Sequence, residues 1–503
     1  MNRSSGILLP LSSLPSPYGI GDLGPSAYAV TDFLHNSGQT YWQILPINPT
    51  DGINSHSPYS CFSAFAGNPL LISPQLMVSA GLLSPAEARV KSAFDEGFVD
   101  YAKVATFKEH LFDLAYARFQ KSKDKKDFER FKDEHKHWLK DFALFMVMKA
   151  LFSGRCWQEW PKPLRTRQAK ALQVFARQHR EALERVELIQ YIFFRQWEQL
   201  RQYAKSQGVA LIGDIPIYVN YDSVEVWCHP RFFKLDQEGA AKFISGCPPD
   251  YFSRTGQRWG NPVYDWAQLK KAKYSWWVQR IAHNLQLFDY LRIDHFRGFV
   301  SFWQIPAHEK LAVFGRWVKG PGEDFFKVLH KQFNHLPLVA EDLGEITPDV
   351  VALMKKFNIP GMRVLLFGFG GDLKTNPHVP HNYELNSVAY SGTHDNNTIQ
   401  GWFRKEAKSY EKANMAQVLG GKVKPSGLHW AMIELLLRSK AQTVIVPMQD
   451  FLGLGSEARM NTPATKVNNW KWRLAPHVLT PALSRKILKL AQVTQRTAYA
   501  KKG

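Results

Sequence analysis

Eight short apolar segments, each ended by turn-forming residues, divide the chain into a regular series. They are rich in β-branched and aromatic residues and close at Gly, Pro, Asn, Asp or Ser, a combination typical of short strands. We expect strands near residues 7, 41, 209, 288, 338, 362, 387 and 443. Several intervening segments carry apolar residues at three- and four-residue spacing, which indicates helices. Eight strands interleaved with helices predict an α/β fold, the (β/α)8 TIM barrel.

The first strand–helix–strand unit has clear helix boundaries. Pro25 suits the first turn of a helix, and Gly38 suits its end. Between them four apolar residues share one face, namely Ala27, Val30, Phe33 and Leu34. The pattern therefore predicts a helix that begins at Pro25 and stops at Gly38.

The long stretch between the second and third expected strands is helical. Helical spacing covers residues 107–120, 127–148 and 184–204. A stretch of that length is an inserted subdomain rather than a loop. We therefore divide the chain into residues 1–81 with the first two strands, the helical insertion 82–205, and residues 206–503 with the other six strands and further loop subdomains.

Two long segments rich in Gly, Pro, Ser and Asn are expected to be functional loops. Residues 47–69 follow the second strand, and residues 245–262 carry three aromatic residues with no evident strand or helix to belong to. Loops of this length in a compact enzyme are commonly lids or binding loops. We interpret residues 245–262 as a lid, whereas turn chemistry with one packed aromatic side chain is the alternative for residues 47–69.

Composition and charge describe a globular protein without an evident polyanion site. The chain of 503 residues is 45% hydrophobic and carries a net charge of +20. In the densest basic run, residues 121–140, acidic residues are interleaved with the lysines, as on a solvated helical face. We therefore expect no nucleic-acid partner, and the charge bears on solubility rather than on the reaction.

The cysteines and the hydropathy pattern exclude several other classes. The four cysteines are far apart with no CxxC spacing, so neither a zinc site, another metal site nor a disulfide framework is expected. No window approaches the roughly 18 apolar residues of a membrane helix. The apolar stretch at residues 6–11 is too short for a signal peptide. We expect a reducing compartment and no membrane association.

Three acidic residues follow expected strands directly or within a few residues. Asp294 ends the strand near 288, Glu341 follows the strand near 338, and Asp395 follows the strand near 387. In a barrel of parallel strands the carboxyl ends form one rim, so the three carboxylates should converge. A nucleophile, a proton donor and a group that steadies an oxocarbenium-like transition state are what retaining glycoside chemistry requires.

Alternation along a strand assigns the neighbouring residues. Arg292 and Asp294 are two apart and share a face, so Arg292 should keep the Asp294 carboxylate ionised. Asp342 points away from Glu341, which indicates a structural role. For Arg292 and Asp294 taken alone, an internal salt bridge is the alternative interpretation.

The motifs that carry these residues resemble a known family. They are RIDHFRG at 292–298, AEDLG at 340–344, GTHDN at 392–396 and GDIPIYV at 213–219, together with the segments 6–16 and 57–69. They are similar to the amylomaltase family of 4-α-glucanotransferases (disproportionating enzymes), in the α-amylase-like group. The matching segments run in the same order from about residue 6 to about residue 473. Motifs in this number and order make the resemblance specific.

The resemblance implies a role for each candidate residue. Asp294 would be the nucleophile, Glu341 the acid and base, and Asp395 the group that holds donor hydroxyls. The substrate-binding residues it implies are Ser57, Tyr59, Asp214, Trp259, Arg292 and His394. No cofactor is expected.

The resemblance also implies partners and a location. The expected substrates are α-1,4-glucans, with glucose or another glucan as acceptor in a retaining double displacement. The protein would be a monomer or small homo-oligomer in the cytoplasm, or alternatively in the plastid stroma. An α-1,4-glucan hydrolase of the same fold shares the three acids and remains an alternative, and a non-catalytic glycan-binding protein is a more distant one.

Overall fold

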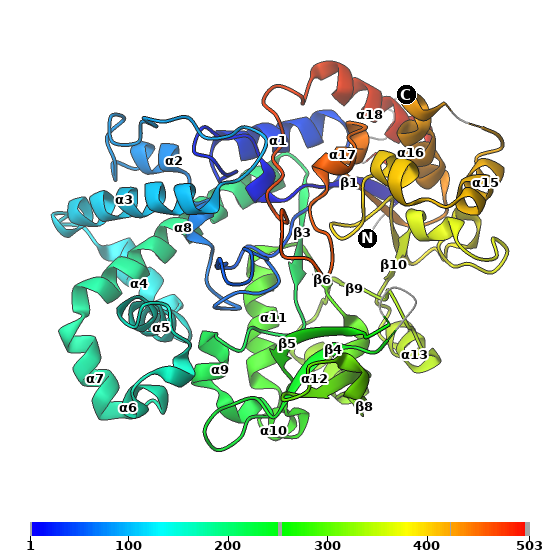
Figure 1. Cartoon of the computed structure of the whole chain (residues 1–503). Coiled ribbons are helices and arrows are strands. Elements are labelled where there is room, and N and C mark those ends of the chain that lie inside the picture. Colours follow the sequence, from blue (N-terminus) through cyan, green and yellow to red (C-terminus); the bar gives the residue numbers. More distant parts are fainter. Residues whose placement is uncertain (1–2, 250–253, 423, 498–503) are drawn as a thin grey trace.

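A closed barrel of eight parallel strands forms the centre of the molecule (Figure 1). The computed structural model describes residues 3–249, 254–422 and 424–497. In sequence order the barrel strands are β1 (Ser4–Leu8), β2 (Tyr41–Gln43), β3 (Ala210–Ile215), β6 (Tyr290–Ile293), β9 (Leu338–Ala340), β10 (Gly361–Val364), β11 (Ser387–Tyr390) and β12 (Thr443–Pro447). All eight lie where the hydrophobic pattern predicts them, so the predicted (β/α)8 barrel is confirmed.

Alternation along these strands decides which side chains fill the barrel. One buried cluster joins apolar residues from most of the strands, among them Leu8, Tyr41, Ile212, Val339, Val388 and Ile445. Two positions beyond Ile212 the same face of β3 carries Asp214, and on the neighbouring strand β6 Arg292 is its register partner. The apolar layer inside the barrel is therefore followed by a charged layer at the carboxyl end.

Helices surround the barrel and cover its outer apolar face. Those outside the insertion are α1 (Pro25–Asn36), α2 (Pro74–Ser79), α9 (Val224–Cys228), α10 (Trp266–Lys271), α11 (Ser275–Leu287), α12 (Glu323–Gln332), α13 (Pro348–Lys356), α14 (Ile399–Gly401), α15 (Ser409–Val418), α16 (Leu428–Arg438), α17 (Met448–Phe451) and α18 (Pro481–Val493). Helix α1 begins at Pro25 as predicted. Within the described ranges, no helix combines the length and apolar character needed to cross a membrane.

The insertion forms a helical layer on one side of the molecule (Figure 1). Its helices are α3 (Tyr101–Gln120), α4 (Lys126–Glu134), α5 (Leu139–Leu151), α6 (Lys162–Arg165), α7 (Ala169–Gln178) and α8 (Arg180–Ser206). The single helix predicted over 127–148 is two helices separated by a turn at residues 135–138; α4 is amphipathic, whereas α5 is buried on most of its surface. Helix α8 packs on α5 and also on α1 and β3, so it joins the insertion to the barrel.

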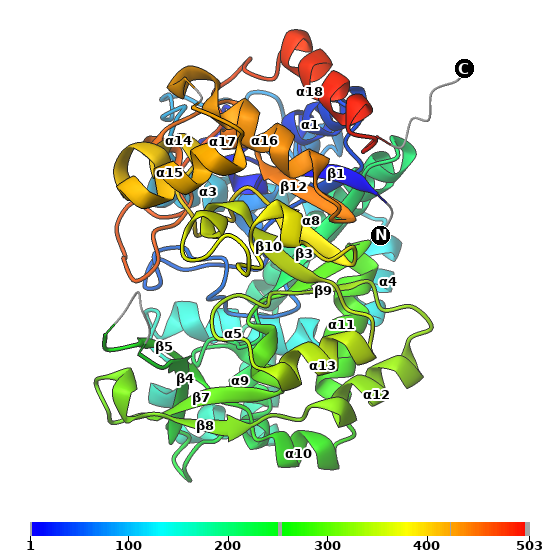
Figure 2. The same ribbon diagram turned by 90° about the vertical axis from the view of Figure 1, so that its right-hand side faces the viewer.

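A second sheet of four strands, in the order β5, β4, β7, β8, lies beside the barrel (Figure 2). Its strands are β4 (Phe243–Cys247), β5 (Gln257–Pro262), β7 (Ser301–Pro306) and β8 (Arg316–Lys319). The prediction that residues 245–262 form one loop is therefore wrong at both ends, although residues 250–253 lie outside the described ranges.

The misleading signal in this segment was its glycine content. A Cβ on Gly246 would come within 2.1 Å of the Gln257 carbonyl oxygen, so this glycine permits the close pairing of β4 with β5. Glycine in a strand marks such close approaches as well as loops. The segment is an antiparallel hairpin with a connection at its tip.

Candidate active site

Three carboxylates follow the carboxyl ends of barrel strands, as the sequence predicts. Asp294 is the first residue after β6, and Glu341 is the first residue after the neighbouring strand β9. Asp395 lies five positions beyond the end of β11. Val339 packs inside the barrel and Glu341 is two residues further, so alternation directs Glu341 toward the barrel axis. The backbone N–H of Phe296 donates to the Glu341 carbonyl oxygen, which joins the two loops.

Arg292 pairs with two carboxylates at once. Its guanidinium lies 2.7 Å from an oxygen of Asp214 and 3.0 Å from an oxygen of Asp294. The side chains of Arg292 and Asp214 are 4% and 0% exposed, whereas that of Asp294 is 31% exposed. Burial lowers the pKa of Arg292, but the attraction of Asp214 and Asp294 outweighs it and raises the pKa overall. Arg292 therefore stays charged and forms an ion pair with each of the two carboxylates.

Glu341 has an environment that keeps its proton near neutral pH. Its two carboxylate oxygens accept hydrogen bonds from the backbone N–H groups of His295, at 2.6 Å, and Leu343, at 2.9 Å. Burial, followed by repulsion from the nearby Asp294 carboxylate, raises the pKa of Glu341 to about 8. The two N–H donors and Arg292 oppose this shift without cancelling it. A protonated Glu341 beside an ionised Asp294 is the pairing of acid and nucleophile that cleavage of a glycosidic bond requires.

Asp395 is held by two polar side chains. The Asn461 amide donates to its Oδ1 at 2.6 Å, and His394 Nε2 lies 3.3 Å from its Oδ2. Burial alone would raise the pKa of Asp395, but His394 and Asn461 outweigh it and hold the pKa at about 2. Asp395 is thus an anion at every pH of interest, suited to accept hydrogen bonds or to stabilise positive charge.

Tyr59 links the loop after β2 to these strand ends. Its hydroxyl donates to Asp214 Oδ2 at 2.8 Å and lies 3.3 Å from His394 Nδ1. The rings of Tyr59 and His394 stack with centroids 4.8 Å apart. The Ser57 hydroxyl accepts a hydrogen bond from the Tyr59 N–H within the same loop. The predicted substrate loop is therefore fixed to the catalytic rim through polar contacts.

These groups surround an open cleft of about 390 Å³. Six of the nine predicted residues line it, namely Ser57, Tyr59, Trp259, Asp294, His394 and Asp395. Asp214 and Arg292 are buried beneath its floor, and Glu341 is partly exposed beside them. The structure thus brings all nine predicted residues to one place, with the charged pair as support and the others at or near the surface.

The second sheet supplies one wall of the cleft. Gln257, Trp259 and Asn261 alternate along β5, share one face and line the cleft together. Trp259 is 37% exposed and meets the ring of His295 edge-on, with centroids 4.8 Å apart. An exposed Trp ring at a polar cleft offers a flat apolar face to a sugar ring.

Sequence reasoning missed several residues of the site. Asn461 contacts Asp395 directly and Trp470 lines the cleft, both from the loop between α17 and α18. Both lie within the stretch over which the chain resembles the family, to about residue 473, but nothing in their spacing identifies these two side chains. His295 adopts a left-handed backbone conformation, with φ of 52°, which turns its N–H toward Glu341. The DHFRG motif contained this residue, yet its backbone role has no sequence signal.

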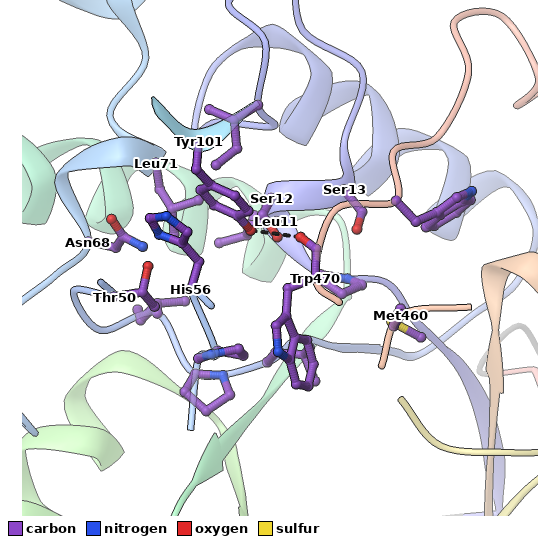
Figure 3. Close-up of a pocket in the computed structure, with 17 residues that line it drawn as sticks. Leu11, Ser12, Ser13, Thr50, His56, Asn68, Leu71, Tyr101, Met460 and Trp470 are labelled. Atoms are coloured by element: carbon purple, nitrogen blue, oxygen red, sulfur yellow. Dashed lines mark hydrogen bonds between the residues drawn. The ribbon is translucent and has the colours of Figure 1, made fainter. Parts of the chain in front are cut away.

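A second, much smaller cavity shares Trp470 with the cleft (Figure 3). Its volume is about 40 Å³, and Trp470 forms part of the wall of both spaces. Tyr101 of α3 donates its hydroxyl to the Trp470 carbonyl oxygen at 2.7 Å and stacks on His56, with centroids 3.9 Å apart. The cavity contains none of the three carboxylates, so its contacts tie the insertion to the cleft wall rather than perform chemistry.

Comparison with known proteins gives a consistent result. A family model described as 4-alpha-glucanotransferase matches residues 9–480. Relatives named 4-alpha-glucanotransferase from Synechocystis and from Thermus thermophilus are each 43% identical, over 99% and 98% of this chain and 99% of their own. A chloroplastic/amyloplastic 4-alpha-glucanotransferase from Solanum tuberosum is 43% identical over 94% of this chain and 82% of its own.

Solved structures show the same similarity. An amylomaltase from Streptococcus agalactiae in complex with acarbose superposes with a TM-score of 0.95 at 36% identity, covering 98% of this chain and all of the other. An amylomaltase from Corynebacterium glutamicum shares the fold, with a TM-score of 0.76 at 15% identity over 97% of this chain and 75% of its own.

Proposed function

Because the chain belongs to the 4-alpha-glucanotransferase family and is a transferase of α-1,4-glucan segments, we propose that it works by a retaining double displacement with Asp294 as nucleophile and Glu341 as acid and base. The observation that carries this mechanism is the difference between the surroundings of Asp294, at the end of β6, and those of Glu341, at the end of β9. Arg292 is ion-paired with Asp294 at 3.0 Å, while burial and the Asp294 carboxylate raise the pKa of Glu341 to about 8. The same site therefore holds a nucleophile and a proton donor at neutral pH.

In the first step an Asp294 carboxylate oxygen attacks the anomeric carbon of the donor. The glycosidic bond breaks as Glu341 passes its proton to the departing 4-oxygen. The result is a covalent glucosyl ester on Asp294, and the remainder of the glucan leaves with its new 4-hydroxyl. Asp395, an anion with a pKa of about 2, stabilises the positive charge on the sugar ring in the transition state.

In the second step an acceptor sugar enters the cleft. Glu341, now a carboxylate, takes the proton of the acceptor 4-hydroxyl as that oxygen attacks the anomeric carbon. The ester bond to Asp294 breaks, and the original configuration is restored after two inversions. We propose glucose or another glucan as the acceptor.

Water must be kept from the ester while the acceptor is admitted. The β4–β5 hairpin and Trp259 support a lid role, because they place an apolar ring at the cleft wall. The substrate-binding roles of Ser57, Tyr59, Asp214, Arg292 and His394 belong to the same proposal. The relatives are named as transferases, and none of these comparisons favours the hydrolase alternative.

The compartment also remains a proposal. We propose the cytoplasm, with the plastid stroma as the alternative, which the plant relative named chloroplastic/amyloplastic supports. A monomer or small homo-oligomer is the expected assembly.

Incubation of the purified protein with maltotriose tests the transfer. Transfer yields glucose together with maltopentaose and longer chains, and total reducing ends stay constant because each transfer breaks one glycosidic bond and makes another. Asp294→Asn and Glu341→Gln should each remove these products. Glucose and maltose with rising reducing ends would show that water is the acceptor instead.

A further inference from the structure

A buried carboxylate outside the cleft occupies a position that the mechanism does not use. Asp450 lies in the short helix α17, directly beyond the barrel strand β12, and is 1% exposed. It is not one of the residues that line the cleft. A buried carboxylate with no ligand is costly unless hydrogen bonds compensate it. The partners of Asp450 therefore indicate what it stabilises.

Asp450 fastens both ends of one loop. Its Oδ2 accepts a hydrogen bond from the Ser391 hydroxyl at 2.6 Å, and its Oδ1 accepts one from the Ile399 N–H at 2.7 Å. Ser391 is the first residue after β11, and Ile399 is the first residue of α14. Both ends of the loop formed by residues 391–399 are therefore hydrogen-bonded to the same carboxylate, that of Asp450.

This loop carries two residues of the active site. His394 and Asp395 lie between the two anchored ends, and both line the cleft. The middle of the loop has its own contacts, since the Arg459 guanidinium donates to the Asp395 carbonyl oxygen at 2.7 Å. The contacts of Arg459 attach the loop to the segment after α17, whereas those of Asp450 attach it to the barrel.

We propose that Asp450 is a positioning residue for the transfer reaction, holding the loop 391–399 so that Asp395 and His394 face the reacting sugar. Because Asp450 acts through Asp395, its role rests on the proposed function. Burial raises the pKa of Asp450 to about 6, so the group is an anion at neutral pH and accepts both hydrogen bonds at once. Bonds to an ionised acceptor are shorter and stronger than neutral ones, which suits a rigid anchor.

The expected consequence concerns rate more than binding. Asp395 is proposed to act on the charged transition state, and a displacement of about 1 Å in such a group can cost on the order of 100-fold in rate. Interactions made only in the transition state affect kcat, whereas those made equally in the bound substrate affect KM. Loss of Asp450 should therefore lower kcat for maltotriose about 10- to 100-fold and change KM by less than about threefold.

Asp22 offers a control, a buried loop anchor away from the cleft. It accepts hydrogen bonds from the Ser16 hydroxyl and the Gly24 N–H, both at 2.8 Å, and also interacts with Ser73 and the buried Lys108. Asp22 anchors a loop that carries no active-site residue. Asp22→Ala should lower the Tm as Asp450→Ala does, yet leave kcat within about twofold of the parent, because only Asp450 holds a loop with active-site residues.

Two milder variants keep the test decisive if Asp450→Ala does not fold. Asp450→Asn retains one carbonyl acceptor for Ile399, and its amide can donate to Ser391, so it should recover much of the lost kcat. Ser391→Ala removes one of the two anchors and should lower kcat several-fold, with a smaller loss of Tm than Asp450→Ala because the Ile399 N–H still bonds the carboxylate. Wild-type kcat in Ser391→Ala and in the soluble Asp450 variants, or an equal loss of kcat in Asp22→Ala, would overturn the inference.

Asp395→Asn separates failure of this inference from failure of the mechanism. If Asp395→Asn is inactive while the Asp450 variants have full kcat, Asp450 has no positioning role and the mechanism stands. If Asp395→Asn is itself fully active, the proposed role of Asp395 fails, and the role of Asp450 fails with it.

Discussion

Proton placement at Glu341 is the central feature at the scale of single residues. Its carboxyl group accepts two backbone hydrogen bonds, which favour the anion, yet burial and the adjacent Asp294 charge favour the neutral acid. Opposing effects of this kind set the acid and base assignments in enzymes that cleave glycosidic bonds. The balance at Glu341 has a direct consequence for the pH dependence of the reaction.

We expect kcat/KM for maltotriose to fall as pH rises through about 8, the raised pKa of Glu341. Below that pH Glu341 carries the proton that the first step consumes, and above it the protonated fraction falls about tenfold per pH unit. An α-glucosyl fluoride donor provides the control. Fluoride leaves without a proton, so the rate of the first step with this donor should not fall as pH rises through about 8. A limb centred near pH 4.5, the ordinary value for Glu, would contradict the assignment.

Arg292 should be costly to remove, because its loss leaves the buried Asp214 carboxylate without a compensating charge. Removing one member of a buried ion pair typically costs about 3–5 kcal/mol. We therefore expect Arg292→Ala to lower the free energy of unfolding in urea by about that amount. The exposed pair of Arg130 and Asp127, at 63% and 53% exposure, is the control, and Arg130→Ala should cost less than about 1 kcal/mol. Equal costs in the two variants would be inconsistent with a buried pair.

The sequence allowed part of this residue-level arrangement to be predicted. Alternation along a strand places Arg292 and Asp294 on one face, and their contact follows. The tighter contact of Arg292, with Asp214, depends on the register of β3 against β6, which brings these two residues opposite each other. Register between strands far apart in the chain has no local signal, so this pair could not be predicted from the residues alone.

At the scale of elements, the four-stranded sheet gives the cleft a wall that the barrel does not provide. Along β5 the odd-numbered residues face the cleft, and Arg258 faces the opposite side. The register through β4 and β7 places Trp317 of β8 on the side of Arg258. The sheet therefore carries tryptophans on both faces, and of Trp259 and Trp317 only Trp259 lines the cleft.

Removal of the Trp259 ring should increase hydrolysis relative to transfer. Without that apolar surface, water reaches the ester on Asp294 more easily, and acceptor sugars lose a stacking face. Total reducing ends released from maltotriose should rise several-fold in Trp259→Ala. Trp317→Ala is the matched control, since Trp317 is 36% exposed against 37% for Trp259 but lies on the other face. A similar rise in both variants would count against a specific lid.

The barrel strands were predictable because each is a compact apolar run with a turn after it. The second sheet was not, since its strands contain Gly246, Gly260 and Pro262, residues that are depleted in strands. Strand β4 pairs with β7, where Trp303 opposite Gly246 lies 57 residues further along the chain (303 − 246), and β8 in turn pairs with β7. The break between α4 and α5 could not be predicted either. Apolar residues keep helical spacing across both helices, although the buried face changes between them.

At the scale of the whole molecule, the net charge does not contribute to the binding of a neutral glucan, whereas the packing of the insertion supports the cleft wall. A neutral glucan gains nothing from a net charge of +20, and the charges of the site are held in local pairs. The insertion contributes through packing, as α8 joins it to the barrel and Tyr101 anchors the Trp470 backbone beside the cleft. The helical character of residues 82–205 was evident in the sequence, but its contact with the cleft wall depends on tertiary packing that periodicity does not encode.

Trapping of the covalent intermediate tests the mechanism most directly. The Glu341→Gln variant should accept an α-maltosyl fluoride donor, because fluoride needs no acid, but should lack the base that activates the acceptor. A maltosyl group should therefore accumulate on the enzyme, and mass spectrometry of the digested protein should locate it on the peptide that contains Asp294. Adding Asp294→Asn to this variant should abolish the adduct. An adduct on a different residue, or none while the fluoride is still consumed, would contradict a double displacement through Asp294.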